Sequence, residues 1–390
     1  MHGQDRAKPF RHRRGDNHRP AKGRERSILF MQQQPRVPVV SVDNKPLMPT
    51  TPGNARKMLK DGVAKPRRNK LGIFYIQMIR PVCAATQPMS LALDPGGKYE
   101  GVAVASRLNV ELTGQVNLPA GIPKKMEARR NLRRARRYRN CPRRPVRFNN
   151  RRHNGKYWLT PTQTAKVNAR LKVVKELCHI YPIQAIFVED VRHKPTGKNG
   201  RYFSMAEVGK KRTYEELVKL ASITLITAEN TAAWRKRFGL TKITGPNRPQ
   251  VFESQAVDAV SILMGSTGCA LGSPLFHIWT ALRFTRRSLH RQSPKKGGIR
   301  PCFGGTTNGG FYRKGDWVQA EKACKLHYGW ICGLPTETTK QVGVSDADGK
   351  RIGQFSPKKI KLLARSTGFG WKDGAALLPT TKAGGFCADL

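Results

Sequence analysis

The chain has 390 residues, of which 73 are lysine or arginine and 25 are aspartate or glutamate, giving a formal net charge of +48. This length predicts two or three domains and excludes a tail or a small scaffold as the whole protein. Charge of this size favours a polyanionic partner, and we expect nucleic acid. The sequence has no apolar run that could span a bilayer, no amphipathic basic helix and no lipid anchor, so we expect no membrane partner.

The first thirty residues are rich in arginine and histidine and do not resemble a signal peptide. We expect residues 1–30 to be a disordered basic arm, or extra sequence upstream of a start at Met31. None of the eight cysteines forms a CxxC pair, which argues against a zinc ribbon or a redox motif. We expect the cysteines to be reduced, in a cytoplasmic or nucleoid compartment.

Residues 31–70 contain a short strand-like run, a proline-marked turn and a basic segment. We expect this segment to lack a core of its own and to dock on the region downstream of it. Three β-segments come next, in "MSLALDPGGKYEGVAVAS" and "LNVELTGQV", and they predict a meander within residues 71–120.

The segment Lys124–Arg152 then holds fourteen basic residues and one acid. Helix formers without glycine or proline predict a helix over Met126–Arg139, and Pro142 ends it before an extended basic strap. Like charges three and four residues apart repel each other, so we expect this helix to be stable only among phosphates. The alternative is an ordinary solvated charge run.

Downstream of this segment, the pattern predicts helix at Thr164–His179, strand at "IQAIFVED", helix at "TYEELVKLA", strand at "ITLITAE" and helix at "FESQAVDAVSILMG". Three strands followed by this alternation is the order of an α/β fold of the RNase H-like kind, with the basic segment inserted after the third strand. Beyond about Ser273 the composition shifts to glycine, arginine and lysine, and short strands predict a small β-barrel or sheet.

Three acids lie where such a fold can bring them together: Asp94 and Glu189 end strands, and Asp258 lies on an apolar helix. Converging carboxylates can hold two Mg²⁺ ions for attack of water on a phosphodiester. Alternatives are a turn at Asp94, a solvated strand end at Glu189 and a helix-face acid at Asp258. Asp190 is the rival of Glu189 for the same role.

Several spaced motifs together resemble a known family, over about residues 31–370. They are "KPLMPTTPGNARKML", "LALDPGGKYEGVAVAS", the arginine-rich insert, "FVEDV", "QAVDAVSIL", "RRSLHRQSPKKGG" and "GFYRKGDWV". The resemblance is to the IscB/IsrB group, RNA-guided nucleases carried by insertion-sequence transposons and using omega (OMEGA) RNAs. The interval between Glu189 and Asp258 is too short for the HNH domain of IscB, and His193 is its only histidine, so the HNH-less IsrB form is the nearer match.

The resemblance implies an RNase H-like RuvC core split by an arginine-rich bridge helix, with a small N-terminal PLMP segment and a C-terminal β-rich domain. The implied divisions are 31–70 for the PLMP segment, 71–120 for RuvC part I, 121–153 for the bridge helix and strap, 154–272 for RuvC parts II and III, and 273–390 for the β-domain. The implied partners are a structured omega guide RNA and a target double-stranded DNA, held by a monomeric ribonucleoprotein. The implied activity is Mg²⁺-dependent nicking of the non-target strand, with Asp94, Glu189 and Asp258 as catalytic metal ligands.

The expected RNA contacts are basic residues of the bridge segment and of a second basic patch. They are Arg129, Arg130, Arg133, Arg134, Arg136, Arg137, Arg139, Arg143, Arg144, Arg147, Arg286, Arg287, Lys295 and Lys296. Arg313 and Lys314 are expected to contact the DNA or its flanking motif. The aromatic residues near them, Phe311, Trp317, Tyr328 and Trp330, are expected to form the core of the β-domain rather than to stack on bases.

One position departs from the family pattern, in which a histidine lies three residues before the last aspartate. Here that residue is Gln255, whose amide has no proton that titrates near pH 7 and cannot act as a general base. Gln255 could position a water molecule or a phosphate oxygen. The alternatives are a weak or inactive RNA-guided DNA-binding protein, and a guide-independent junction-type nuclease.

Overall fold

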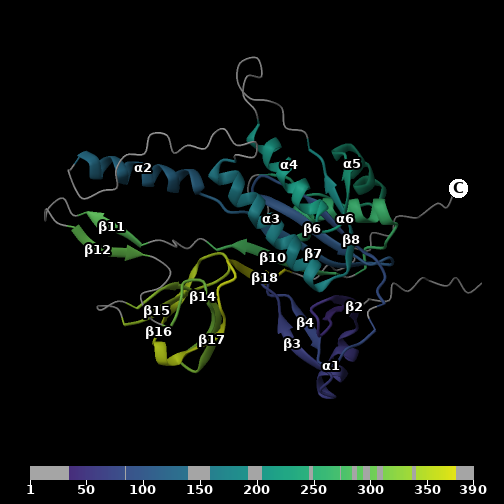
Figure 1. Ribbon diagram of the computed structural model, residues 1–390, viewed down its shortest axis with the longest axis horizontal. Helices are drawn as coiled ribbons and strands as arrows, with labels where there is room; N and C mark the ends of the chain where they lie inside the picture. The colour runs from purple at the N-terminus through teal and green to yellow at the C-terminus, as the bar shows by residue number, and fades with distance from the viewer. Residues whose placement is uncertain are drawn as a thin grey trace, which may run out of the picture. The chain divides into compact units, whose positions relative to one another are not determined.

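A seven-stranded mixed sheet carries the largest core of the protein, as the computed structural model shows (Figure 1). In spatial order its strands are β18 (Phe369–Asp373), β10 (Leu275–Ala281), β7 (Val110–Asn117), β6 (Tyr99–Ala105), β5 (Met89–Asp94), β8 (Ile183–Glu189) and β9 (Ser222–Ile226). Strands β5, β8 and β9 are parallel, and β6 is antiparallel to both of its neighbours. A three-stranded meander joined to two further parallel strands is the RNase H-like order, which confirms the predicted fold class.

The structure describes residues 35–83, 85–138, 159–191, 204–245, 249–272, 274–282, 288–292, 299–304, 311–335 and 340–374. All of them belong to one unit of the chain, residues 34–390. Within this described part, no helix is both long enough and apolar enough to cross a membrane.

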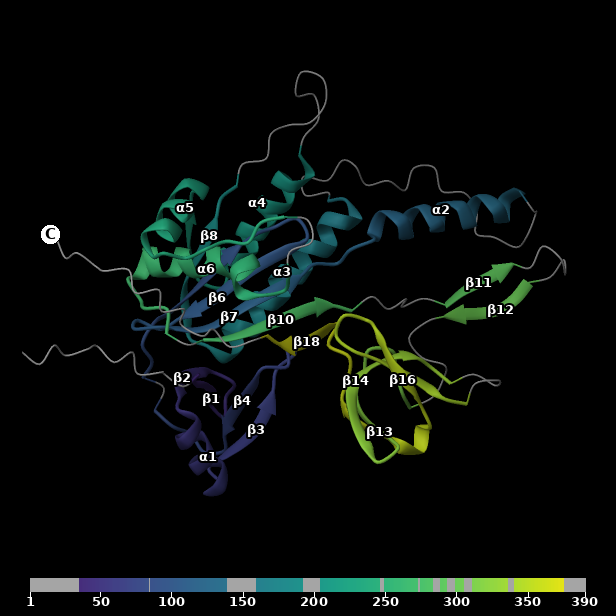
Figure 2. The same ribbon diagram turned by 180° about the vertical axis from the view of Figure 1, so that it is seen from behind.

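Alternating side chains give the sheet two apolar faces, as expected for strands covered on both sides. Helix α3 (Pro161–Ile180) packs on the face that carries Leu91 and Leu93, and α4 (Met205–Val218) packs against α3. Helix α6 (Phe252–Thr267) packs on the other face, and α5 (Ala228–Arg237) packs against α6. Figure 2 shows the same layers from behind.

Close contact between α6 and the sheet depends on small residues. Ala92 and Ala103 lie beneath the helix, and Gly101 of β6 has no room for a side chain, because an added Cβ would lie 2.1 Å from the backbone oxygen of Gln255. The sequence "FESQAVDAVSIL" therefore forms a helix that is buried nearly all round.

The sheet includes two strands that the sequence pattern assigns to the C-terminal β-domain. Strand β10 pairs in parallel with β7, and β18 pairs antiparallel with β10. The segment 273–390 therefore does not form one separate β-domain. The reason is the apolar run "LFHIWTA", in which Phe276, Ile278 and Trp279 are buried, so the run fits a strand covered on both faces.

The N-terminal sheet consists of four strands and one helix. The strands are, in order, β2 (Pro46–Thr50), β1 (Val37–Val40), β4 (Phe74–Met78) and β3 (Ala64–Arg68), and the helix is α1 (Pro52–Lys60). The N-terminal sheet extends beyond the predicted boundary at residue 70 to Met78, and its small apolar cluster around Ile76 includes side chains from β4. The segment also docks on the main sheet, since Trp279 Nε1 donates a hydrogen bond to Leu71 O at 3.0 Å.

The C-terminal sheet has five antiparallel strands. They are, in order, β16 (Arg351–Phe355), β15 (Val342–Ser345), β14 (Lys325–Gly333), β13 (Trp317–Lys322) and β17 (Ile360–Ala364), with the 3₁₀ turn η3 (Pro357–Lys359) before β17. A two-stranded hairpin, β11 (Ser288–Gln292) with β12 (Ile299–Gly304), precedes it. Val318 and Ile331 lie in the core of the five-stranded sheet, and Trp330 is buried nearby. Phe311 and Tyr328 are exposed, so the predicted aromatic core is only partly correct.

Helix α2 (Ile122–Tyr138) lies between β7 and α3 in the chain and corresponds to the predicted arginine-rich helix. It begins four residues earlier than expected, because Pro123 is favourable in the first turn of a helix. It packs only lightly on α3, and its described arginine side chains are exposed. The predicted strap beyond Tyr138 lies outside the described residues.

Candidate active site

The three predicted carboxylates converge at one edge of the main sheet. Asp94 and Glu189 end adjacent parallel strands, whose registered pair Leu93 and Val188 immediately precedes them. Asp258 comes from α6, which crosses the same face of the sheet. Glu189 and Asp258 are buried, and Asp94 is half-buried. Elements far apart in the sequence thus gather three acids in the interior.

The pKa of Asp94 is raised well above its ordinary value, first by burial and next by the charge of Glu189. A hydrogen bond between the two carboxyl groups and the charge of Asp258 raise it further, whereas Lys242 lowers it. The close approach of the Glu189 carboxyl group therefore favours the protonated form of Asp94. A cation at this edge would relieve the same repulsion.

Two cationic side chains hold Asp258, and neither was among the predicted site residues. Arg235 Nη1 of α5 lies 2.5 Å from Asp258 Oδ1, and Lys242 Nζ, from the loop after α5, contacts Oδ2. Both oxygens of a carboxylate that is only 2 % exposed are therefore neutralised. The run "WRKRFGLTK" gave no signal that separates these two residues from the many other basic residues of the chain.

Gln255 lies one helical turn before Asp258 on the same side of α6. It is 5 % exposed, and its Nε2 has no hydrogen-bond partner among the described residues. A buried donor without a partner costs about 1–3 kcal/mol, so an amide in this state is available for a ligand atom. The role predicted for Gln255 at the acidic cluster stays a prediction.

Asp190, the alternative to Glu189, belongs to a different environment. It accepts a hydrogen bond from Tyr214 Oη at 2.9 Å and pairs with Lys210 Nζ at 2.9 Å. Both partners come from α4, which is on the face opposite to α6. Alternation along the strand end thus directs Glu189 to the acidic cluster and Asp190 away from it.

A polar row extends from Asp94 across the sheet. Gly101 pairs with Asp94, and Gln115 pairs with Gly101. Gln115 Nε2 donates to Asn117 Oδ1 at 2.6 Å, and Asn117 Nδ2 donates to Thr280 Oγ1 at 2.9 Å. These side chains were not predicted, because "LNVELTGQV" indicates a strand but not which side chains reach the site.

The chemistry of the acidic cluster suits a hard cation, since every candidate ligand is a carboxylate oxygen, the type that Mg²⁺ prefers. Among the described residues, however, no group of three histidine, cysteine or acidic side chains has the geometry of a metal site. The contacts give the reason: Asp258 is bonded to Arg235 and Lys242, while Asp94 and Glu189 are bonded to each other. Metal binding by all three would require Asp258 to exchange a cationic partner for the ion.

A small basic hollow of about 170 Å³ adjoins Glu189 on the α3 side. Lys166 and Arg170 of α3 and Lys210 of α4 line it. Lys166 Nζ donates to Gly97 O at 2.6 Å, and Arg170 Nε donates to the buried Glu100 Oε1 at 3.0 Å. The acidic centre therefore has basic side chains at its rim, as a site for a polyanion requires.

The predicted RNA contacts are only partly described. Arg129, Arg130, Arg133, Arg134 and Arg137 lie exposed on α2. The side chain of Arg136 and all of the remaining expected contacts lie outside the described residues; the latter are Arg139, Arg143, Arg144, Arg147, Arg286, Arg287, Lys295 and Lys296.

The expected DNA contacts, Arg313 and Lys314, lie in the turn before β13, Arg313 exposed and Lys314 half-buried. The turn is held by the buried Asp316, whose Oδ2 accepts hydrogen bonds from the backbone N–H of Arg313 at 3.0 Å and from Arg365 Nη1 at 2.7 Å.

Comparison with known proteins gives one family match. Residues 37–200 match a family model described as "RRXRR protein". No curated protein matches the chain in sequence.

Two solved structures match part of the chain. One is RuvC of Thermus thermophilus in complex with a Holliday junction substrate, at 12% identity and a TM-score of 0.27, covering 46% of this chain and 92% of that one. The other is Thermus thermophilus RuvC, at 13% identity and a TM-score of 0.23, covering 45% and 92%. Because these scores are low, the fold assignment depends on the strand order described above. The chain is thus similar to the RRXRR family model over residues 37–200, and its main sheet has the RNase H-like strand order with acids at one edge.

Proposed function

We propose that the protein is an RNA-guided, Mg²⁺-dependent nuclease of the IsrB type, which nicks the non-target strand of double-stranded DNA. The observation that carries this proposal is the convergence of Asp94, Glu189 and Asp258 at one sheet edge. An interior cluster of acids is costly unless it binds cations. Such a cluster in an RNase H-like fold favours phosphodiester hydrolysis over binding alone.

The position of α2 supports a nucleic-acid partner beside this edge. Strand β6 is antiparallel to both β5 and β7, so β5 and β7 run in the same direction and end at the same edge of the sheet. Helix α2 starts five residues after β7 ends, and thus leaves from the edge that carries Asp94. RNA on its exposed arginines would lie next to the site of DNA cleavage. Base pairing between guide and target would then supply the sequence specificity.

Asp94, Glu189 and Asp258 would hold the Mg²⁺. When bound, the ion supplies Lewis acidity toward a phosphoryl oxygen and lowers the pKa of a coordinated water. The chain's own groups bind and orient the strand. Arg235 and Lys242 place positive charge at Asp258, where they can meet phosphate oxygens, and Gln255 can donate from its free Nε2 to a water or a phosphate oxygen.

A second candidate is a weak or inactive RNA-guided DNA-binding protein. Two observations favour it: Gln255 replaces a titratable histidine, and Asp258 is already neutralised by two cationic side chains. In this case Arg235 and Lys242 would take the place of the metal and stabilise a site that does not cut.

The test is a nicking assay on supercoiled plasmid with Mg²⁺, using the full chain purified with its bound RNA, which is sequenced to design the target. Asp94→Asn keeps the shape of the side chain and removes its charge, and Asp190→Asn is the matched control on the other face. We expect the first variant to lose at least about a thousandfold in nicking rate, several kcal/mol of transition-state stabilisation, and the control to nick normally.

Equal nicking by both variants would refute the site, and purified protein without a discrete RNA would refute RNA guidance. If the wild type binds its target but does not nick it, Gln255→His distinguishes the two candidates. Restored nicking in that variant would show that the natural protein is a binder with an incomplete site.

A further inference from the structure

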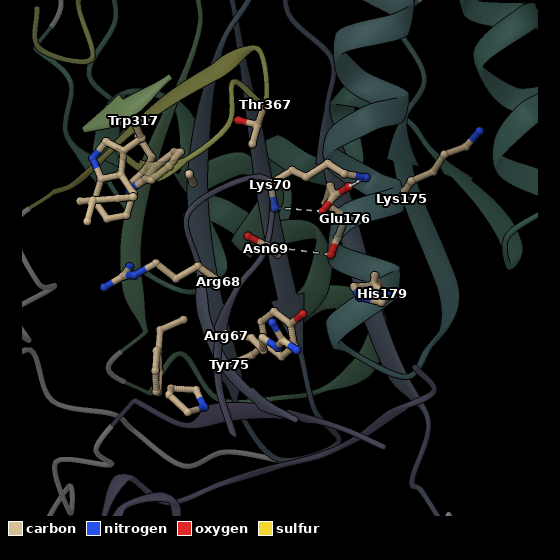
Figure 3. Close-up of a pocket in the computed structure, with 15 residues that line it drawn as sticks. Arg67, Arg68, Asn69, Lys70, Tyr75, Lys175, Glu176, His179, Trp317 and Thr367 are labelled. Carbon is tan, nitrogen blue, oxygen red and sulfur yellow. Dashed lines mark hydrogen bonds and ion pairs between the residues drawn. The ribbon is translucent and has the colours of Figure 1, made fainter. Parts of the chain in front are cut away.

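A cavity of about 860 Å³ lies where the N-terminal sheet, α3 and the C-terminal strands meet (Figure 3). One wall comes from β3 and the loop after it, one from the last turns of α3, and one from Trp317 and Trp371. We call it the Trp317 cavity. Its volume is within the range of about 300–1,000 Å³ that accommodates a small molecule, and therefore admits a base with its sugar and phosphate.

The Trp317 cavity is separate from the acidic cluster. Lys166, near the start of α3, contacts Gly97 in the turn after Asp94, whereas Glu176 and His179, at the end of the helix, line the cavity. Ten residues of helix between Lys166 and Glu176 correspond to about 15 Å along its axis. A ligand in the cavity would thus be held at the end of α3 remote from the carboxylates.

The charge of the cavity wall is strongly positive. Arg67, Arg68, Lys70 and Lys175 line it, and Glu176 is its one acid. Lys70 already neutralises Glu176, since its Nζ lies 2.9 Å from Oε1 and its backbone N–H donates to Oε2 at 3.1 Å. Arg67 lies on the β3 wall, and Lys175 is exposed at the rim on the α3 side, with its ammonium directed away from Trp317 (Figure 3). An anionic ligand can therefore contact Arg67 on one wall and the exposed Lys175 at the rim.

The aromatic wall is rigid. The Trp371 ring packs edge-on against Trp317 and Trp330, each at 5.1 Å between centroids. Gly72 packs against it so closely that a Cβ there would lie 2.2 Å from the Trp371 ring. Trp317 is half-buried, and the Arg68 guanidinium lies 5.7 Å from its centroid. A fixed, partly exposed indole beside arginine is the surface on which unpaired bases stack.

We propose that the Trp317 cavity binds an unpaired nucleotide of the protein's RNA, with the base against Trp317 and its flanking phosphates at Arg67 and Lys175. An acidic peptide would satisfy the cations but would leave the aromatic wall without a planar partner. The scissile phosphate of the DNA is excluded by the distance from the carboxylates. The proposal takes from the proposed function only the RNA as resident ligand.

The test uses the full chain and a fluorescein-labelled twelve-nucleotide single-stranded RNA, with binding measured by anisotropy from 0.05 to 0.5 M salt. The variants are the charge-reversing pair Arg67→Glu/Lys175→Glu and, separately, Trp317→Leu, which keeps an apolar side chain against Trp371. The matched control is Lys57→Glu/Lys60→Glu on α1, which makes the same charge change on residues outside the cavity. Far-ultraviolet circular dichroism shows that each variant is folded.

We expect the cavity pair to lower the slope of log affinity against log salt by about 1.4, the value for two lost phosphate contacts, and the control pair to leave it unchanged. We expect Trp317→Leu to weaken binding by about five- to a hundredfold with an unaltered slope. Cross-linking by ultraviolet light should place a nucleotide adduct on the peptide that contains Trp317.

Equal slopes for the cavity and control pairs, or full affinity in Trp317→Leu, would overturn the proposal. So would a poly-glutamate peptide that binds the wild type as tightly as the RNA does and loses its affinity in the same variants. These results are distinct from a failure of the proposed function. If the protein nicks DNA under RNA guidance and the cavity variants have no effect on binding, only the proposal for the Trp317 cavity is refuted. If the protein carries no bound RNA and does not nick DNA, the proposed nuclease function is refuted.

Discussion

The acidic cluster and helix α2 both gather like charges, but the protein stabilises them in opposite ways. Glu189 and Asp258 are buried and Asp94 is half-buried, and Arg235 and Lys242 offset the repulsion among the three acids by pairing with Asp258. The described arginine side chains of α2 are exposed, and water and salt screen their repulsion. Interior charge must be neutralised within the fold, whereas surface charge can remain for a partner.

The largest effect that we predict concerns the surface charge. Replacing Arg129, Arg130, Arg133, Arg134 and Arg137 together by glutamine should lower affinity for the bound RNA by about a hundredfold or more and the salt slope by about 3.5. The same five changes to lysine keep the charge and should keep the slope, with a loss limited to bidentate contacts. Filter binding across salt concentrations measures both. Identical slopes for the glutamine and lysine variants would show that α2 is only a solvated charge run.

The next prediction concerns a buried ion pair near the acidic cluster. Burial raises the pKa of Glu100, and Arg170 partly offsets this. Arg170→Met should therefore destabilise the protein by about 3–5 kcal/mol, measured by urea unfolding, because it leaves a buried charge without a partner. The double change Glu100→Gln/Arg170→Met should recover most of the loss.

This destabilisation should depend on pH in a defined direction. A buried acid with a raised pKa keeps its proton in the folded state after the unfolded chain has released its own, so stability falls as pH rises from the unfolded pKa through the folded one. The deficit of Arg170→Met should thus be smaller near pH 4.5 than at pH 7. A deficit that is constant over this range would mean that Arg170 acts through packing alone.

A smaller effect would test whether Lys242 competes with a metal ion for Asp258. Lys242→Met removes one of the two cations on Asp258, so we expect a lower melting temperature without divalent ions and a larger rise on adding Mg²⁺ than in the wild type. The expected difference is a few degrees by differential scanning fluorimetry. Lys236→Met, at an exposed position of α5, is the control. An equal Mg²⁺ response in both variants would contradict competition between Lys242 and the metal for Asp258.

The smallest predicted effect concerns the reactivity of the Cys178 thiol, which is shielded by burial alone. Burial raises the pKa of the Cys178 thiol to about 11. In the native protein at pH 8, Cys178 should resist alkylation while the exposed Cys83 and Cys324 react, as measured by mass spectrometry of the peptides. Because an unfolded chain ionises this thiol at lower pH, stability should decline between about pH 9 and 11. Rapid labelling of Cys178 at pH 8 would indicate local opening of α3.

The parts of the fold that sequence analysis predicted correctly have strong local patterns. Asp94 and Glu189 end apolar strands, and Asp258 interrupts an apolar helix, so each acid could be placed on an element from its neighbours alone. Strands β10 and β18 were assigned to the wrong region, because their pairing joins segments about ninety residues apart, and a change in composition near Ser273 suggested a boundary there.

The parts of the site that sequence analysis missed depend on tertiary contacts. Arg235 and Lys242 belong to a basic run like several others, and only the packing of α5 on α6 brings them to Asp258. Trp317 was expected in the core, but Gly72 and Trp371 place it at a cavity wall instead. In both cases the function of the side chain depends on which segment lies across from it.

The pairing of β10 with β7 has a consequence for how the protein is made. During synthesis the ribosome delivers β5 to β9 first, while the edge of β7 has no neighbour and the apolar side chains of β10 are still absent. An unpaired strand edge is prone to aggregate, so we expect the nascent core to need protection until β10 emerges. Strand β18 joins still later, which makes the central sheet one of the last parts of the described chain to be completed.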